Sequence, residues 1–153
     1  MQIDELARQH HELSQMAAEL LIAINAPEPR PVAALRWRLA RALLAHLALE
    51  DSYLYPALRG SQEPSVAGVA ASFREEMGQL APMFRKYLAE WADLRIANEW
   101  PVFATETRTI ISALRQRILY EDNTLYPAAR AALQSTSGVA AQNHTLDRGR
   151  NAA

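Results

Sequence analysis

Apolar residues recur along this chain at spacings of three and four, which is the period of an amphipathic α-helix. Proline and glycine interrupt the pattern at 27–31, at 60–64 and at Pro101, and neither residue favours continuation of a helix. The pattern therefore predicts four helices, over residues 4–25, 31–59, 65–96 and 101–133. Pro82 falls inside the third helix and is expected to kink it.

The same pattern defines a fold class and two regions. No segment shows the strict alternation of a β-strand, and the connections between the predicted helices are short. The sequence therefore predicts an all-α fold, an up-down-up-down four-helix bundle, over residues 1–133. Residues 134–153 are rich in Ser, Gly, Asn and Thr, and we expect them to form a flexible C-terminal tail.

Composition and charge exclude several classes of function. Of the 153 residues, 50% are hydrophobic and 22% are charged, which is typical of a globular protein. The chain has no cysteine, so disulfides, zinc–thiolate sites and thiol catalysis are excluded. A net charge of -1 argues against nucleic-acid and anionic-membrane partners, and no run of 18 apolar residues could span a bilayer. The acidic N-terminus does not resemble a secretory signal, so we expect a cytoplasmic protein.

The second and fourth predicted helices carry the same segment, 71 residues apart. Residues 50–59 read Glu-Asp-Ser-Tyr-Leu-Tyr-Pro-Ala-Leu-Arg and residues 121–130 read Glu-Asp-Asn-Thr-Leu-Tyr-Pro-Ala-Ala-Arg, so seven of ten positions are identical. Glu50 and Glu121 fall on the apolar stripes of their helices, and a pseudo-twofold arrangement would bring them toward each other in the core. A buried carboxylate needs a cation or several hydrogen-bond donors.

Histidines accompany these glutamates. His46 precedes Glu50 by one helical turn, so the two side chains share a helix face, which is a metal-ligand spacing in bundle cores. His10 lies on the apolar stripe of the first helix, and His11 lies about 100° away around that helix. The sequence leaves open which of these two histidines faces the core.

With these motifs the chain resembles the hemerythrin-like, or HHE cation-binding, family over about residues 6–132. The resemblance implies a four-helix bundle with a non-haem di-iron site. The family pattern is a His on helix one, His-x-x-x-Glu on helix two, a His on helix three and His-x-x-x-Glu or His-x-x-x-Asp on helix four. The positions that match the pattern are His10, His46, Glu50 and Glu121. Met77 and Arg117 stand where helices three and four would supply histidines, so the resemblance implies that the ligands of one iron remain.

Arg117 also has a physical interpretation of its own. Two facing carboxylates cannot both stay ionised without positive charge, and a guanidinium can supply it with bidentate geometry. A fixed cation also repels a second metal ion, by on the order of 4 kcal/mol per unit charge at ~4 Å and a dielectric of about 20. The site is then a full di-iron centre, a half-site with one metal ion, or a metal-free core in which Arg117 pairs with Glu50 or Glu121. We favour the metal-free core, so no cofactor is favoured, although the half-site allows one iron, manganese or zinc ion.

Four tyrosines lie close to the repeated segments. Tyr53 is one turn beyond the first glutamate and Tyr120 borders the second, so either hydroxyl could support a site carboxylate, with core packing as the alternative. Tyr55 and Tyr126 each precede a proline, and we expect them to pack beside it near a helix kink or end.

Three functions remain. The favoured one is a non-enzymatic regulatory or adaptor protein with a degenerate di-iron site, which acts through a protein partner or as a homo-oligomer. The alternative is a metal, oxygen or redox sensor that binds a single ion through His10, His46, Glu50 and Glu121. A peroxidase-like or oxidase enzyme is the least favoured, because two ligands of the di-iron pattern are missing. No nucleic-acid or membrane partner is expected.

Overall fold

The computed structural model describes the backbone of residues 3–147 and the side chains of residues 3–135, 137 and 138. Every regular element in this range is helical, so the predicted all-α class is confirmed for the described residues. The elements, with η for a π-helical turn, are α1 (Ile3–Ile24), α2 (Ala33–Leu49), η1 (Glu50–Leu54), α3 (Tyr55–Arg59), α4 (Pro64–Met77), α5 (Leu80–Glu90), α6 (Asp93–Asn98), α7 (Trp100–Tyr120), η2 (Glu121–Leu125) and α8 (Tyr126–Asp147).

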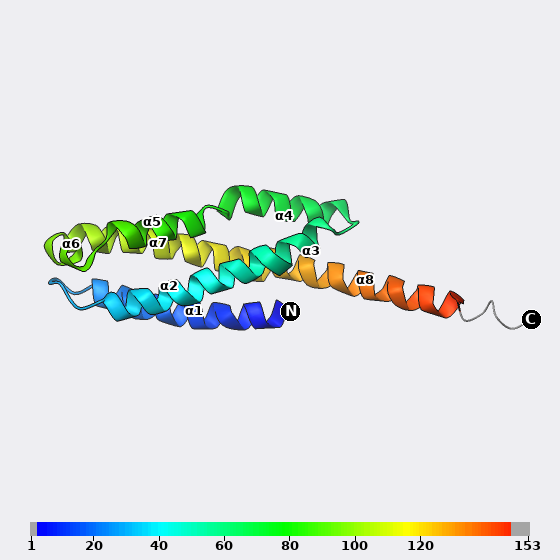
Figure 1. Cartoon of the computed structure of the whole chain (residues 1–153), viewed down its shortest axis with the longest axis horizontal. Coiled ribbons are helices and arrows are strands. Elements are labelled where there is room, and N and C mark those ends of the chain that lie inside the picture. Colours follow the sequence, from blue (N-terminus) through cyan, green and yellow to red (C-terminus); the bar gives the residue numbers. More distant parts are fainter. Residues whose placement is uncertain (1–2, 148–153) are drawn as a thin grey trace, which may run out of the picture.

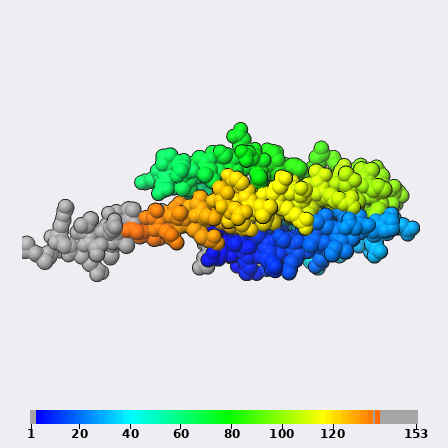
Figure 2. Space-filling view, turned by 180° about the vertical axis from the view of Figure 1, so that it is seen from behind, coloured from blue at the N-terminus to red at the C-terminus, as the bar shows by residue number. Residues whose placement is uncertain are grey.

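Successive helical elements run end to end and form longer rods that lie side by side (Figure 1). The rods are α1, then α2 with η1 and α3, then α4 with α5, and finally α7 with η2 and α8; α6 lies at the turn between the last two. Both α1 and α5 contact α2 and α7, so the rods enclose one elongated core. From behind, α7 and the start of α8 run between α1 on one side and α4 and α5 on the other (Figure 2).

The first predicted helix, 4–25, is confirmed as α1, but the third predicted helix differs from expectation. It does not kink at Pro82: α4 ends at Met77 and α5 begins at Leu80. Pro82 therefore lies in the first turn of α5, where its missing N–H is not needed. The proline ring would clash with the carbonyl of Gly78 in a continuous helix, so the chain breaks before the proline and not at it.

The fourth predicted helix is longer than expected. It does not end near 133 but continues in α8 to Asp147, and Figure 1 shows α8 extending past the other helices. Residues 134–147 of the predicted tail are thus helical, because this stretch contains no proline and its single glycine, Gly138, costs only about 1 kcal/mol. The remaining tail residues, 148–153, lie outside the described part of the chain.

Each repeated segment contains one π-helical turn. The N–H of Tyr55 bonds to the carbonyl of Glu50, and the N–H of Tyr126 bonds to the carbonyl of Glu121, five residues back in each case. The extra residue relieves the clash that the following proline would make in a regular α-helix. The helical backbone therefore continues past the proline of each repeat. From the sequence, a kink or an end of the helix was expected there. Each turn also places the glutamate and the tyrosine one above the other.

The core consists of two apolar clusters with a polar layer between them. The larger cluster includes Leu13 and Leu43, and the smaller one includes Leu6 and Leu54. On α1 the buried His10 lies between Leu6 and Leu13, so it separates the two clusters. The other buried residues of this polar layer are His46, Glu50, Arg117 and Glu121.

Within residues 3–147, none of the helices combines the length and the apolar character that crossing a bilayer requires.

The larger cluster sets a stability prediction. Phe103 is fully buried and packs against the rings of Tyr87, Trp91 and Trp100. Phe103→Ala should lower the free energy of unfolding by about 3–5 kcal/mol, because it removes buried contacts and leaves a cavity. Trp37 is 58% exposed, so Trp37→Ala is the control and should change this energy by less than about 0.5 kcal/mol. Urea unfolding followed by circular dichroism measures both, and equal losses would contradict the assigned core.

Candidate metal centre

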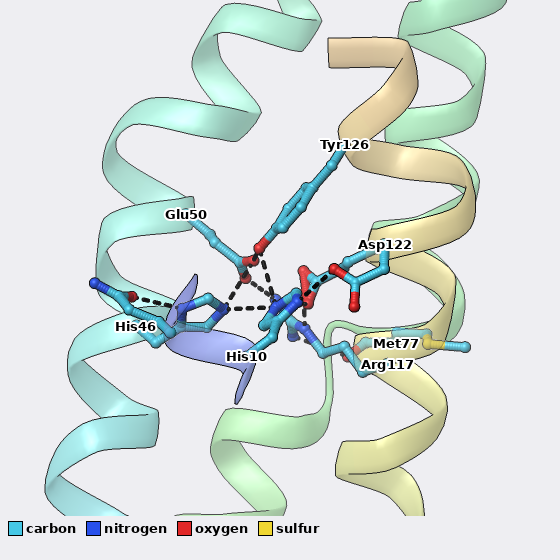
Figure 3. A network of polar contacts seen from close by, with 9 residues as sticks. His10, His46, Glu50, Met77, Arg117, Asp122 and Tyr126 are labelled. Carbon is cyan, nitrogen blue, oxygen red and sulfur yellow. Dashed lines mark hydrogen bonds and ion pairs between the residues drawn. The ribbon is translucent and has the colours of Figure 1, made fainter. Parts of the chain in front are cut away.

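Four buried side chains from three of the rods converge in the polar layer (Figure 3). Each offers one ligand atom, and these atoms all lie within 4.8 Å of one another. No member of the set is more than 3% exposed. The structure thus brings together the whole candidate half-site, which consists of His10, His46, Glu50 and Glu121.

Hydrogen bonds on the outer ring nitrogens hold the two histidines. His10 Nδ1 lies 2.7 Å from Asp122 Oδ1, and His46 Nδ1 lies 2.8 Å from Gln9 Oε1. Because both oxygens are acceptors, each Nδ1 carries the proton and donates it. The Nε2 atoms are then left with lone pairs, and they lie 3.2 Å apart inside the cluster. Sequence reasoning had not assigned this orienting role to Asp122 or Gln9.

His10, and not its neighbour His11, faces the core. His10 is 2% exposed, whereas His11 lies on the exposed side of α1. Burial lowers the pKa of His10 even though the hydrogen bond with Asp122 works in the opposite direction. The ring is therefore neutral at pH 7, which is the form that ligates a metal.

Arg117 enters the same layer from α7 and forms ion pairs with both glutamates, the one with Glu121 being longer, at 3.6 Å between Nε and Oε2. Its Nη2 donates to Glu50 Oε2 at 2.6 Å, and its Nη1 donates to the carbonyl of Met77 at 3.3 Å. The guanidinium also lies over the ring of Phe73, 5.2 Å from the ring centre. The Met77 sulfur points away from the cluster, and the side chain packs against the smaller apolar cluster (Figure 3).

The two glutamates differ in protonation. Burial opposes the ionisation of Glu50, but hydrogen bonding to Glu121 and the positive charge of Arg117 outweigh it and hold the pKa of Glu50 well below its usual range. Burial and the negative charge of Glu50 raise the pKa of Glu121 well above its usual value. Without a further cation, the pair therefore retains a shared proton to higher pH than a free carboxyl would, and Arg117 balances the ionised Glu50.

The centre holds more acceptors than donors. His46 Nε2 lies 3.1 Å from Glu50 Oε1, and His10 Nε2 lies 3.3 Å from Glu121 Oε1. Among the described residues, Glu121 Oε2 is buried without a hydrogen-bond partner, and the Arg117 Nε that lies 3.6 Å from it is also unpartnered. A buried space with an excess of lone pairs is satisfied by a metal ion. Two imidazole nitrogens and two carboxylates form a donor set that suits iron, manganese or zinc, so the residues fit such an ion.

The tyrosine at the centre is Tyr126, and not Tyr53 or Tyr120. The Tyr126 hydroxyl donates to Glu50 Oε1 at 2.6 Å. Tyr53 is 57% exposed and Tyr120 stacks on Phe73, and within residues 3–147 neither hydroxyl contacts the cluster. The expectation that Tyr53 or Tyr120 supports a site carboxylate is thus corrected. The π-helical turn brings Tyr126 inward, and the Glu-x-x-x-x-Tyr spacing of both repeats was the available signal.

The raised pKa of Glu121 makes stability depend on pH. Because the folded protein holds this proton more tightly than the unfolded chain, the metal-free protein should lose stability as pH rises above about 4.5, by up to about 1.4 kcal/mol per pH unit. Glu121→Gln keeps a donor toward Glu50 but does not titrate, so its stability should fall less. Thermal melts in chelator over this range measure the difference. Glu76→Gln, at an exposed position, is the control. Parallel curves for the parent and Glu121→Gln would contradict a shared proton.

Comparison with known proteins agrees with this geometry. The family model described as the hemerythrin HHE cation binding domain matches residues 1–129, which include all four clustered ligand residues. Searches of curated proteins and of solved structures gave no significant match. Because the family model covers most of the chain, this protein belongs to the hemerythrin HHE cation-binding family.

Proposed function

We propose that this chain is a hemerythrin-like domain that binds a single metal ion and acts as a non-enzymatic metal, oxygen or redox sensor. The ion would be held by His10, His46, Glu50 and Glu121. The observation that carries this proposal is the orientation of the two histidines. Asp122 and Gln9 fix both rings so that their lone pairs meet 3.2 Å apart in a buried, acceptor-rich space.

The position of Arg117 favours the binding of one metal ion over the binding of two. Its guanidinium contacts Glu50 Oε2, whereas His46 approaches Glu50 Oε1, so a cation is already present on one side of this carboxylate. A divalent ion on that side would be repelled by on the order of 8 kcal/mol at ~4 Å and an effective dielectric of about 20. Met77, which replaces the family's histidine on the third rod, turns its sulfur away. The di-iron site is therefore degenerate in this proposal.

The chain's own residues would hold the ion and tune it. His10 and His46 would each donate a nitrogen, and Arg117 helps to keep Glu50 ionised. Iron would add a redox couple, and any of the three metals would add Lewis acidity. The ligands are buried and Arg117 closes one side, which supports sensing over substrate turnover. The order of the four rods in Figure 1 supports the up-down-up-down bundle, and a protein partner or a second copy of the chain would read the state of the site.

A metal-free adaptor is the second candidate. The observation that favours it is the 2.6 Å ion pair between Arg117 and Glu50, which balances the one negative charge left when Glu121 is protonated. In that case the network would be purely structural, and the function would rest on a protein partner. The two candidates differ in whether a metal ion stabilises the fold.

Metal binding should depend on His10 and not on His11. An ion at about 100 times its Kd should raise the free energy of unfolding by about 2.7 kcal/mol, because it binds only the folded state. His10→Ala should abolish most of this gain, and His11→Ala should retain it. Thermal melts with zinc, manganese and anaerobic ferrous iron measure the effect. No gain with any of the three in the parent, or equal gains in both variants, would count against the metal site.

Restoring the two missing histidines should restore the second metal position. Arg117 faces the two glutamates and its guanidinium reaches the backbone of Met77, so position 77 borders the centre and a histidine there could turn toward it in another rotamer. The double variant Met77→His and Arg117→His should bind about two ferrous ions per chain, one more than the parent, as counted by elemental analysis after anaerobic loading. The two single variants are the controls. A double variant that binds no additional ion would show that these positions do not correspond to the family's ligands.

A further inference from the structure

The hydroxyl of Tyr126 lies among the ligand atoms of the proposed ion. It is 3.1 Å from His10 Nε2 and 2.6 Å from Glu50 Oε1. The residue is fully buried, and its ring stacks on His10 with 11° between the planes. In Figure 3 the phenol oxygen points directly at the space between these two side chains.

These separations are those of neighbouring ligands on one ion. Metal–nitrogen and metal–oxygen bonds of about 2.0–2.2 Å place adjacent donors at right angles about 3 Å apart. The two Nε2 atoms are 3.2 Å apart, and His46 Nε2 lies 3.1 Å from Glu50 Oε1. The distance of 3.1 Å between the Tyr126 hydroxyl oxygen and His10 Nε2 falls in the same range. The tyrosine oxygen thus lies at a ligand-like distance from one histidine nitrogen and one glutamate oxygen of the cluster.

The repeat offers an internal comparison. Tyr55 is the counterpart of Tyr126, follows the same π-helical turn and is also buried. It lies on the Arg117 side, where both residues line a cavity of about 250 Å³. Among the described residues, the Tyr55 hydroxyl makes no hydrogen bond to the cluster, whereas the Tyr126 hydroxyl donates to Glu50 and lies 3.1 Å from His10 Nε2. Only the tyrosine on the histidine side therefore reaches the donor set.

We propose that Tyr126 is a fifth ligand and that it makes the site selective for ferric iron. A phenolate is a hard, charged donor, and tyrosinate serves as an iron ligand in proteins. With ionised Glu50 and Glu121 it gives three negative charges, one of which Arg117 already balances, so the preference for ferric iron rests on the hardness of the phenolate donor. Coordination replaces the O–H bond of Tyr126 by an oxygen–iron bond, and the proton leaves to the solvent. This inference rests on the proposed metal site.

Spectroscopy tests the assignment directly. The parent and Tyr55→Phe, loaded with ferric citrate, should show a visible phenolate-to-iron charge-transfer band and resonance-enhanced phenolate vibrations in the Raman spectrum. Tyr126→Phe should lose both signals and bind ferric iron at least about tenfold more weakly. Zinc chloride should still raise the melting temperature of Tyr126→Phe, because the four other ligands remain. Ring-deuterated tyrosine should shift the Raman bands of the parent, so the test does not depend on the stability of a variant.

The outcomes separate this inference from the proposed function. A parent that binds one ion but shows no band, or a Tyr126→Phe variant that keeps the band, would overturn Tyr126 as a ligand and leave the metal site in place. A parent that binds neither zinc nor iron would overturn both.

Discussion

Two glutamate side chains meet inside an apolar core, and the rest of the structure depends on how their charge is neutralised. Glu50 and Glu121 lie in a polar layer between two apolar clusters, where water cannot solvate them. Arg117 neutralises one of the two charges. The second is removed by a proton on Glu121 or balanced by a metal ion at the histidine side. The binding of either a proton or a metal ion at Glu121 is therefore the chemistry that this fold makes available.

The polar layer joins all four rods. His10 comes from α1, His46 from α2 and Arg117 from α7, and Arg117 reaches the carbonyl of Met77 at the end of α4. The two apolar clusters hold these helices in place on either side of the layer. A change of charge at the centre would therefore act on groups that come from each of these helices.

The sequence predicted what local patterns encode. Helical periodicity located α1, the His-x-x-x-Glu spacing with its partial repeat indicated His46, Glu50 and Glu121, and the resemblance to the family added His10. The break before Pro82, the length of α8 and both π-helical turns were missed, because they depend on how proline and glycine are accommodated within a packed chain. Tyr126 was assigned to packing for the same reason. A π-helical turn shifts the phase of the helix, and helical periodicity cannot reveal this shift.

The central claim is that Arg117 replaces one of two cations, so that the centre holds a single metal ion. Elemental analysis of protein purified without chelator, before and after anaerobic ferrous loading, tests it most directly. The account predicts about one iron, manganese or zinc ion per chain after loading. Two ions per chain would show that Arg117 does not exclude the second metal. None would show that Arg117 and the proton on Glu121 neutralise the centre by themselves.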